Sequence, residues 1–470
     1  MKKTFIILSV FFLLQKIKAQ VYPHLNLNLL SHLDPEKDAT GFDLRKYSGC
    51  WGWEQSDKNK EYTIIGTSSK TYFIDVSVPT NPIICDSVKA KRNGCTWREI
   101  KTYQNYCYIV SDDPSPNSFQ IVDMKYLPDS VHVVYDGNSY FERVHTLFID
   151  KDKMYCGTVT STVGAIESMC VYSLATPSVP LLIRKLSDDI PSITYVHDMY
   201  VNNDTIFASC GGQGLFIMKL LPSNTFSLLA SYSGYPYAGY NHSSWLTENK
   251  KILVFTDEVP AGLPIKVIDV SDLSNINLLD TVRSQDRATA HNPYILSNKW
   301  CWVSSYQDGL YLYNISNPDE AFMYGFFDTH PQHGLNDNYV TNAYRGNWGA
   351  YPFLKSKIII ACDMQNGIFI LEGDEYYKTN KEPPFKPSIF SIYPNPINEN
   401  LAIYLLDQKN KTITFTIINL LKQVIFESHA FIDENKFKYL INASNLSSGI
   451  YFISITGEGI SETKKIIIQN

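Results

Sequence analysis

Two short apolar runs, Tyr62-Thr63-Ile64-Ile65-Gly66 and Tyr72-Phe73-Ile74-Asp75-Val76, follow each other closely in the sequence. Both are rich in aromatic and β-branched residues and a polar segment separates them, so they predict two neighbouring strands. Similar pairs recur along the chain, for example Lys357-Ile358-Ile359-Ile360-Ala361 followed by Ile368-Phe369-Ile370-Leu371. These runs are almost continuously apolar, which is typical of strands that are buried on both faces of a sheet.

A bulky ring residue precedes each pair of runs, and these residues recur at intervals of 45 to 57 residues. In chain order they are Trp51, Trp97, His145, His197, His242, His291 and Trp348. Repeats of about 40–50 residues that each hold several short strands are typical of β-propeller blades. The sequence therefore predicts an all-β fold built on a seven-bladed β-propeller. A ring of six blades with irregular ends is the alternative.

The seventh repeat ends at Leu371-Glu372-Gly373 without an outer strand of its own. Near the N-terminus, Leu25-Asn26-Leu27-Asn28-Leu29-Leu30-Ser31 resembles an outer strand, but the other strands of a repeat do not precede it. We expect this segment to complete the seventh blade, because ring closure removes the exposed edge of an open sheet.

The first nineteen residues have the pattern of a secretory signal peptide. Lys2 and Lys3 precede the apolar stretch Phe5–Leu14, and Ala19 provides a small residue for cleavage. The stretch is shorter than the roughly 20 apolar residues that a membrane-spanning helix needs. We therefore expect export by the Sec machinery and no transmembrane segment.

Length and composition bound the remaining possibilities. The chain has 470 residues, of which 44% are hydrophobic and 19% charged, and its net charge is −6. A weakly acidic chain of this kind does not indicate nucleic acid as a partner. The predicted domains are a signal peptide (1–19), the propeller (20–373), a polar, Pro-rich linker (374–387) and a small C-terminal β-sandwich (388–470).

The C-terminal part contains three landmarks in order. They are Tyr393, Pro394, Asn395 and Pro396, then Gly449 and Tyr451, and finally Lys464 and Lys465. With these landmarks the segment resembles the type A sorting domain of the type IX secretion system of Bacteroidota. The resemblance implies passage through the periplasm, recognition by the type IX secretion machinery and removal of the domain. The cargo would then be released or attached to surface lipopolysaccharide. An adhesive β-sandwich that stays on the chain is the alternative.

Residues 22–373 resemble the LVIVD-repeat proteins of the "choice-of-anchor B" group. The matching segments are Trp51-Gly52-Trp53, Gly66-Thr67-Ser68, Phe73-Ile74-Asp75-Val76-Ser77, Asn81-Pro82, Trp97-Arg98-Glu99-Ile100, His197-Asp198, Asn241-His242, His291-Asn292, Phe326-Phe327-Asp328-Thr329 and Trp348-Gly349-Ala350-Tyr351-Pro352. The resemblance implies a propeller-like fold and a surface location, and it implies no particular biochemical activity.

The nine cysteines invite a disulfide interpretation, because the chain is predicted to be exported. Five of them are predicted to lie at or near the end of the second strand of five blades: Cys107, Cys156, Cys210, Cys301 and Cys362. A repeated place in a repeated strand indicates packing, so we expect these five to be buried free thiols. A bridge between Cys50 and Cys95 is a further possibility.

The ring residues are the candidate functional site. If each begins an innermost strand, all seven point into the central channel, with Trp51, Trp97 and Trp348 on one arc. The other arc is His145, His197, His242 and His291, and clustered neutral imidazoles suit one divalent transition metal. Asp198 and Asn292 follow their histidines directly, so strand alternation predicts that they point away. Asp257, Glu258 and Asp363 are the carboxylates expected near the channel mouth.

Structural roles compete with these functional ones. A repeated histidine can hydrogen-bond between blades, and the tryptophans can pack the channel rather than stack on a carbohydrate. The sequence also contains no Gly-x-Ser-x-Gly, His-Glu-x-x-His or phosphate-binding Gly-rich signature.

These observations lead to three functional hypotheses. The first is a cell-surface or secreted propeller that binds a ligand or protein partner at its channel mouth without catalysis. The second is a metal-dependent extracellular hydrolase or lyase in which the four histidines bind the metal and Asp257 or Glu258 is the general base. The third is a structural scaffold of the cell envelope.

Overall fold

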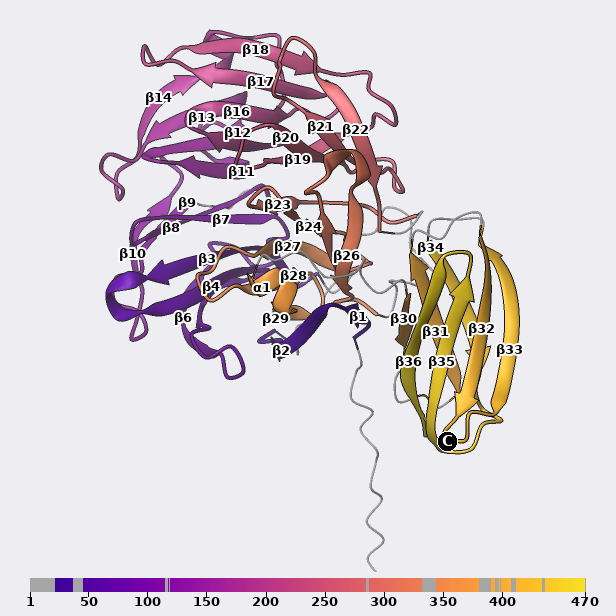
Figure 1. The fold of residues 1–470 in the computed structure, drawn as a ribbon. Helices are drawn as coiled ribbons and strands as arrows, with labels where there is room; N and C mark the ends of the chain where they lie inside the picture. The colour runs from indigo at the N-terminus through magenta and orange to yellow at the C-terminus, as the bar shows by residue number, and fades with distance from the viewer. Residues whose placement is uncertain are drawn as a thin grey trace, which may run out of the picture.

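The computed structural model describes residues 22–36, 45–114, 117, 119–284, 287–331, 344–379, 390–393, 397, 399–406, 411–432 and 436–469 (Figure 1). The predicted signal peptide and three residues of the first sorting landmark, Pro394, Asn395 and Pro396, lie outside these ranges. Strands make up nearly all of the described secondary structure, which confirms the all-β class. Among the described residues no helix is long and apolar enough to span a membrane.

Strands between residues 24 and 373 of the described chain form seven antiparallel sheets. Five of these sheets are four-stranded meanders, in which each strand pairs with the next along the chain. They are β3–β6 (Tyr47–Gln55, Lys60–Thr67, Lys70–Asp75, Ile83–Lys89), β7–β10 (Arg98–Tyr103, Tyr106–Ser111, Phe119–Asp123, His132–Gly137), β11–β14 (Arg143–Asp150, Lys153–Thr160, Ile166–Ser173, Leu181–Lys185), β15–β18 (Asp198–Asn202, Thr205–Ser209, Leu215–Leu220, Phe226–Tyr232) and β19–β22 (Asn241–Leu246, Ile252–Asp257, Ile265–Asp269, Asn277–Val282).

The other two sheets each take a strand from the N-terminal segment. The sixth contains β23 (Pro293–Leu296), β24 (Trp300–Ser304), β25 (Leu310–Asn314) and β26 (Phe322–Phe327), with β1 (His24–Leu25) as a fifth strand. The seventh contains β27 (Asn347–Tyr351), β28 (Ile358–Asp363) and β29 (Gly367–Gly373), and β2 (Leu27–Leu33) is its outer strand. The predicted pairing of the N-terminal segment with the seventh repeat is thus confirmed. The additional strand β1 was not predicted.

Inner strands of successive sheets contact one another in a closed circuit. β3 contacts β7, β7 contacts β11, and the series continues through β15 and β19 to β23. The second strand of the sixth sheet, β24, contacts β27, which in turn contacts β3. The faces between neighbouring sheets are apolar, as where Ile64 and Phe73 pack with Ile100 and Val122. Outer strands such as β6 and β10 are largely exposed. Burial of the apolar faces between neighbouring sheets therefore stabilises the ring of sheets. In this ring the first strands lie nearest the common centre.

The C-terminal region consists of two sheets that pack on one another. One contains β30 (Phe390–Tyr393), β31 (Asn400–Leu406) and β34 (Lys436–Asn442), and the other contains β32 (Lys411–Asn419), β33 (Val424–Ile432), β35 (Gly449–Gly457) and β36 (Ile460–Ile468). Their shared core includes Leu401, Ile403, Phe415, Ile453 and Ile466. This is the expected small β-sandwich.

Helices are short and lie in connections. The 3₁₀ helices are η2 (Ser56–Lys58), η3 (Leu186–Asp188) and η4 (Pro318–Glu320), and α1 (Glu375–Thr379) lies in the segment predicted as a linker. Tyr377 of α1 is buried, with its ring 5.3 Å from that of Trp302. The start of the predicted linker is therefore packed against the sixth sheet.

All nine cysteines are free thiols, and Cys85 alone among them is not fully buried. The suggested bridge between Cys50 and Cys95 is wrong. Cys50 lies instead beside Cys362 of β28, whose thiol donates a hydrogen bond to the carbonyl of Ser48 at 2.9 Å. Cys107, Cys156, Cys210, Cys301 and Cys362 are buried free thiols, as predicted. They do not share one place in their strands, because Cys107 and Cys301 are the second residues of β8 and β24 and Cys210 follows β16.

Candidate functional site

A cavity of about 50 Å³ lies where the first strands meet. A volume of this size has room for a few water molecules or a partly hydrated ion. All seven predicted ring residues line it: Trp51, Trp97, His145, His197, His242, His291 and Trp348. The sequence repeat therefore brings together, in one place, side chains that are up to about 300 residues apart.

Six of the seven rings form a curved row around the cavity. Neighbouring ring centroids lie 4.2 Å apart for His145–His197, 4.4 Å for His197–His242, 4.4 Å for His242–His291, 4.3 Å for His291–Trp348 and 5.1 Å for Trp348–Trp97. Four imidazoles are thus consecutive, as the sequence predicted, and two indoles continue the row.

Trp51 lies at a different level from the other six, contrary to expectation. Trp348 sits in the irregularity of β27 between the paired residues Asn347 and Gly349. In β3 the corresponding irregularity lies between Tyr47 and Cys50, so Trp51 falls beyond it. Ser48 therefore takes the place in β3 that Trp348 takes in β27. A sequence alignment by ring residues cannot detect this shift.

The tryptophans are packed rather than presented as an open platform. The Trp51 ring lies 4.1 Å from the Lys101 ammonium and 4.8 Å from the ring of Tyr351. Trp97 packs edge-on against Tyr344 at 4.9 Å, and the Arg45 guanidinium lies 5.6 Å from it. The two cations lie over ring faces that a carbohydrate would need.

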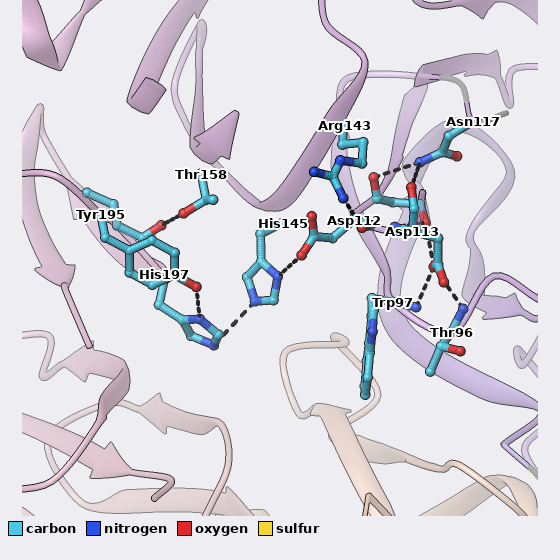
Figure 2. A network of polar contacts seen from close by, with 12 residues as sticks. Thr96, Trp97, Asp112, Asp113, Asn117, Arg143, His145, Thr158, Tyr195 and His197 are labelled. Atoms are coloured by element: carbon cyan, nitrogen blue, oxygen red, sulfur yellow. Dashed lines mark hydrogen bonds and ion pairs between the residues drawn. The ribbon is translucent and has the colours of Figure 1, made fainter. Parts of the chain in front are cut away.

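A polar chain begins at the edge of the histidine row (Figure 2). The Nδ1 of His145 donates a hydrogen bond of 2.8 Å to Asp112, and its Nε2 lies 3.2 Å from the Nε2 of His197. Burial alone would lower the pKa of His145, but the hydrogen bond and the negative charge of Asp112 raise it above its usual value. Asp112 therefore both orients this imidazole and favours its protonated form.

His197 continues the chain toward two tyrosines. Its Nδ1 lies 3.0 Å from the hydroxyl of Tyr195 and 2.9 Å from that of Tyr240. Burial, together with the neighbouring histidines, lowers the pKa of His197 well below its usual value. Burial and His242 act in the same direction on the pKa of His291, whose Nδ1 donates a hydrogen bond of 2.5 Å to the carbonyl of Trp348. Both imidazoles are consequently neutral near pH 7.

His242 stands next to a carboxylate. Its Nε2 lies 3.7 Å from the carboxylate of Glu258, and its buried Nδ1 has no hydrogen-bond partner among the described residues. Glu258 also accepts a hydrogen bond of 2.7 Å from the hydroxyl of Tyr306. One ligand atom from each of His197, His242 and Glu258 lies within 4.8 Å of the others. The structure thus joins two of the four predicted histidines with one of the predicted carboxylates.

Asp257 is not available as a general base. Its buried carboxylate forms an ion pair with the buried ammonium of Lys266 and accepts a hydrogen bond of 2.8 Å from the hydroxyl of Tyr235. Asp363, the other candidate, accepts a hydrogen bond of 2.7 Å from the hydroxyl of Thr329. Asp257 and Asp363 are thus held by polar partners away from the histidine row. Of the three predicted carboxylates, Glu258 is the one that lies beside this row.

The prediction missed polar residues that line the cavity, among them Glu99, Lys101 and Asp198. Asp198 was expected to point away, yet it accepts hydrogen bonds from Thr146 at 3.0 Å and Ser243 at 2.6 Å. His197 precedes β15 rather than lying in it, so strand alternation does not apply between these two neighbours. Burial raises the pKa of Glu99, and the charge of Lys101, 3.5 Å away, partly offsets this effect.

Comparison with solved structures gives distant similarities. The chain is similar to the extracellular domain of a one-component system of B. thetaiotaomicron, with 13% identity and a TM-score of 0.45 over 90% of this chain and 57% of that one. It therefore spans little more than half of that relative. The WD40 β-propeller domain of Doa1 aligns with 10% identity and a TM-score of 0.48 over 76% of this chain and 99% of that one. The computationally designed Ika8 protein aligns with 10% identity and a TM-score of 0.44 over 70% and 96%.

No curated protein matches the chain. Residues 391–469 match the family model of the secretion system C-terminal sorting domain. This range holds all the described strands of the β-sandwich except the first residue of β30. The chain thus carries a type IX secretion sorting domain, which directs a protein to the cell surface or the extracellular space.

Proposed function

We propose that this protein is an exported seven-bladed β-propeller that binds a small polar ligand in its central cavity. The seven sheets would be the blades of residues 20–373, joined through residues 374–387 to the sorting domain of residues 388–470. The resemblance to LVIVD-repeat proteins supports the same fold. One observation carries the proposal: residues from all seven sheets, including four consecutive histidines, surround one small cavity.

The lining favours a polar ligand of few atoms. Asp198, Glu99 and Lys101 add charged groups to the histidine row, while Trp51 and Trp348 supply apolar walls. Small-molecule sites commonly combine apolar walls with a few converging polar groups. A volume of about 50 Å³ admits only small ligands, so a polymer would have to present a terminal group at the mouth.

Cavity filling tests this proposal. Formate, acetate and phosphate serve as probes, and tryptophan fluorescence reports their binding, because Trp51, Trp97 and Trp348 line the cavity. Gly349→Leu places a side chain in the cavity beside the Tyr294 hydroxyl, which lies 3.2 Å from the added Cβ. Gly212→Leu is the matched control, because a Cβ there meets nothing within 4 Å.

We expect at least one probe to bind the wild type and the Gly212→Leu variant but not the Gly349→Leu variant. Binding that survives in Gly349→Leu contradicts the proposal, and so does the absence of binding for all three probes. Thermal unfolding of both variants shows whether the substitutions leave the fold intact.

A further inference from the structure

We propose that His197, His242 and Glu258 together hold one divalent transition-metal ion inside the ring of sheets. This inference rests on the proposed ligand site and deepens it, because it names the class of ligand. The three residues come from different segments: the position just before β15, strand β19 and the loop after β20. The ring of sheets itself, rather than any local motif, assembles the site.

The distances suit a metal. One ligand atom from each residue lies within 4.8 Å of the other two. Ligands about 2.0–2.2 Å from a tetrahedral ion lie about 3.3 Å from each other, so small side-chain rotations close the set. His145 lies outside this three-residue group. Its Nε2 lies 3.2 Å from the Nε2 of His197, so the hydrogen bond between these atoms would have to break when the ion binds. A water molecule would complete the tetrahedron.

The chemistry of the donors also suits a metal. His197 and His242 are both buried, and each offers an imidazole nitrogen to the shared space. His242 has a buried Nδ1 without a hydrogen-bond partner in the described part of the chain. Two imidazoles and one carboxylate favour ions such as Zn²⁺, Co²⁺ or Ni²⁺ over Ca²⁺ or Mg²⁺, which prefer oxygen ligands alone.

Outer residues orient the three donors, as they do in established metal sites. The hydroxyls of Tyr195 and Tyr240 lie within 3.0 Å of the Nδ1 of His197, which directs its Nε2 into the row. The hydroxyl of Tyr306 donates to Glu258 and leaves the other carboxylate oxygen facing His242. The carboxylate also balances part of the charge of the ion.

The test uses the exported protein purified without a His tag, stripped with a chelator and titrated with Co²⁺. Visible absorption reports tetrahedral coordination, and elemental mass spectrometry gives the stoichiometry. We expect one Co²⁺ for each chain. Because loss of an outer partner costs about 10–100-fold in metal affinity, loss of the ligand in His242→Ala should cost at least about 100-fold. His132→Ala, which removes an exposed histidine of β10, should leave affinity unchanged.

Glu258→Gln provides a second test, because it keeps the shape of the side chain even if His242→Ala does not fold. It should weaken Co²⁺ binding by at least 10-fold and alter the visible spectrum. Uptake that neither substitution changes overturns the proposal, since the ion then binds elsewhere. If Co²⁺ and Zn²⁺ fail to bind while formate, acetate or phosphate still binds, the metal proposal is overturned and the proposed ligand cavity is not. Failure of every probe overturns both.

Discussion

The Nε2 atoms of His145 and His197 lie 3.2 Å apart, and the pKa values of the two imidazoles are shifted in opposite directions. Two nitrogen lone pairs at this distance repel each other, so one of the atoms carries a proton. The carboxylate of Asp112 makes His145 the donor, and burial makes His197 the acceptor. Asymmetry between adjacent, chemically identical residues is therefore imposed by a single carboxylate at one end of the row.

Replacement of His197 should reduce the sensitivity of the fold to acid. Its folded-state pKa lies well below the usual 6.5, so the unfolded state binds a proton more readily. The resulting stability is present above about pH 6.5 and is lost as the pH falls. We expect the drop in Tm between pH 7.5 and 5.5 to be smaller in His197→Asn than in the wild type. An equal drop in both proteins contradicts the assignment, and His132→Asn serves as the control.

Asp112→Asn should lower the pKa of His145. The substitution removes the charge that raises this pKa, while the burial that lowers it remains. In the wild type the stabilisation from this pair is complete below about pH 6.5 and is lost as the pH rises through the raised folded-state pKa. Titration of the imidazole signals by NMR measures the change. A His145 pKa that stays the same in Asp112→Asn rules out the ion pair as its cause.

Lys266→Met should destabilise the fifth sheet strongly. It leaves the buried carboxylate of Asp257 without its cation, which costs about 3–5 kcal/mol in the free energy of unfolding. The double variant Asp257→Leu/Lys266→Met should recover much of this loss, because no buried charge remains unpaired. Chemical unfolding of the three proteins gives the comparison. If the double variant is less stable than Lys266→Met alone, the pair is not the source of the loss.

Leu27→Ala should weaken the closure of the ring. Leu27 begins β2, is 1% exposed and packs in the core shared by the sixth and seventh sheets. Truncation of such a buried leucine costs about 2–5 kcal/mol. Leu29 of the same strand is 38% exposed, so Leu29→Ala should change stability by less than about 0.5 kcal/mol. Similar unfolding midpoints for the two variants would show that β2 contributes little to the core.

The predictable parts of this structure are those encoded by local repetition. Strand runs and their order followed from apolar patterning, and the outer strand of the seventh sheet followed from the missing run after Gly373. The histidine row followed from spacing alone. Each succeeded because one residue type recurs at one place in a repeated unit.

The parts that could not be predicted depend on register and on distant partners. Trp51 was placed at the wrong level because two residues of β3, Ser48 and Gly49, lie outside the regular pairing. Asp257 seemed free because nothing in the sequence marks Lys266 of the next strand as its partner. Asp198 faces the cavity because β15 begins one residue after His197. Strand register and distant partners determine these features, and no periodic pattern in the sequence marks them.

The pairing of β2 with β29 also sets an order of assembly. Leu27 lies opposite Gly373, so β2 cannot pair until β29, about 340 residues later in the sequence, is also present. Because synthesis runs from the N-terminus, β2 is made early and β29 much later. Contacts between such distant residues form slowly, because a long loop must close first. The ring of sheets therefore closes late, and β2 is among the last segments to be fixed in place.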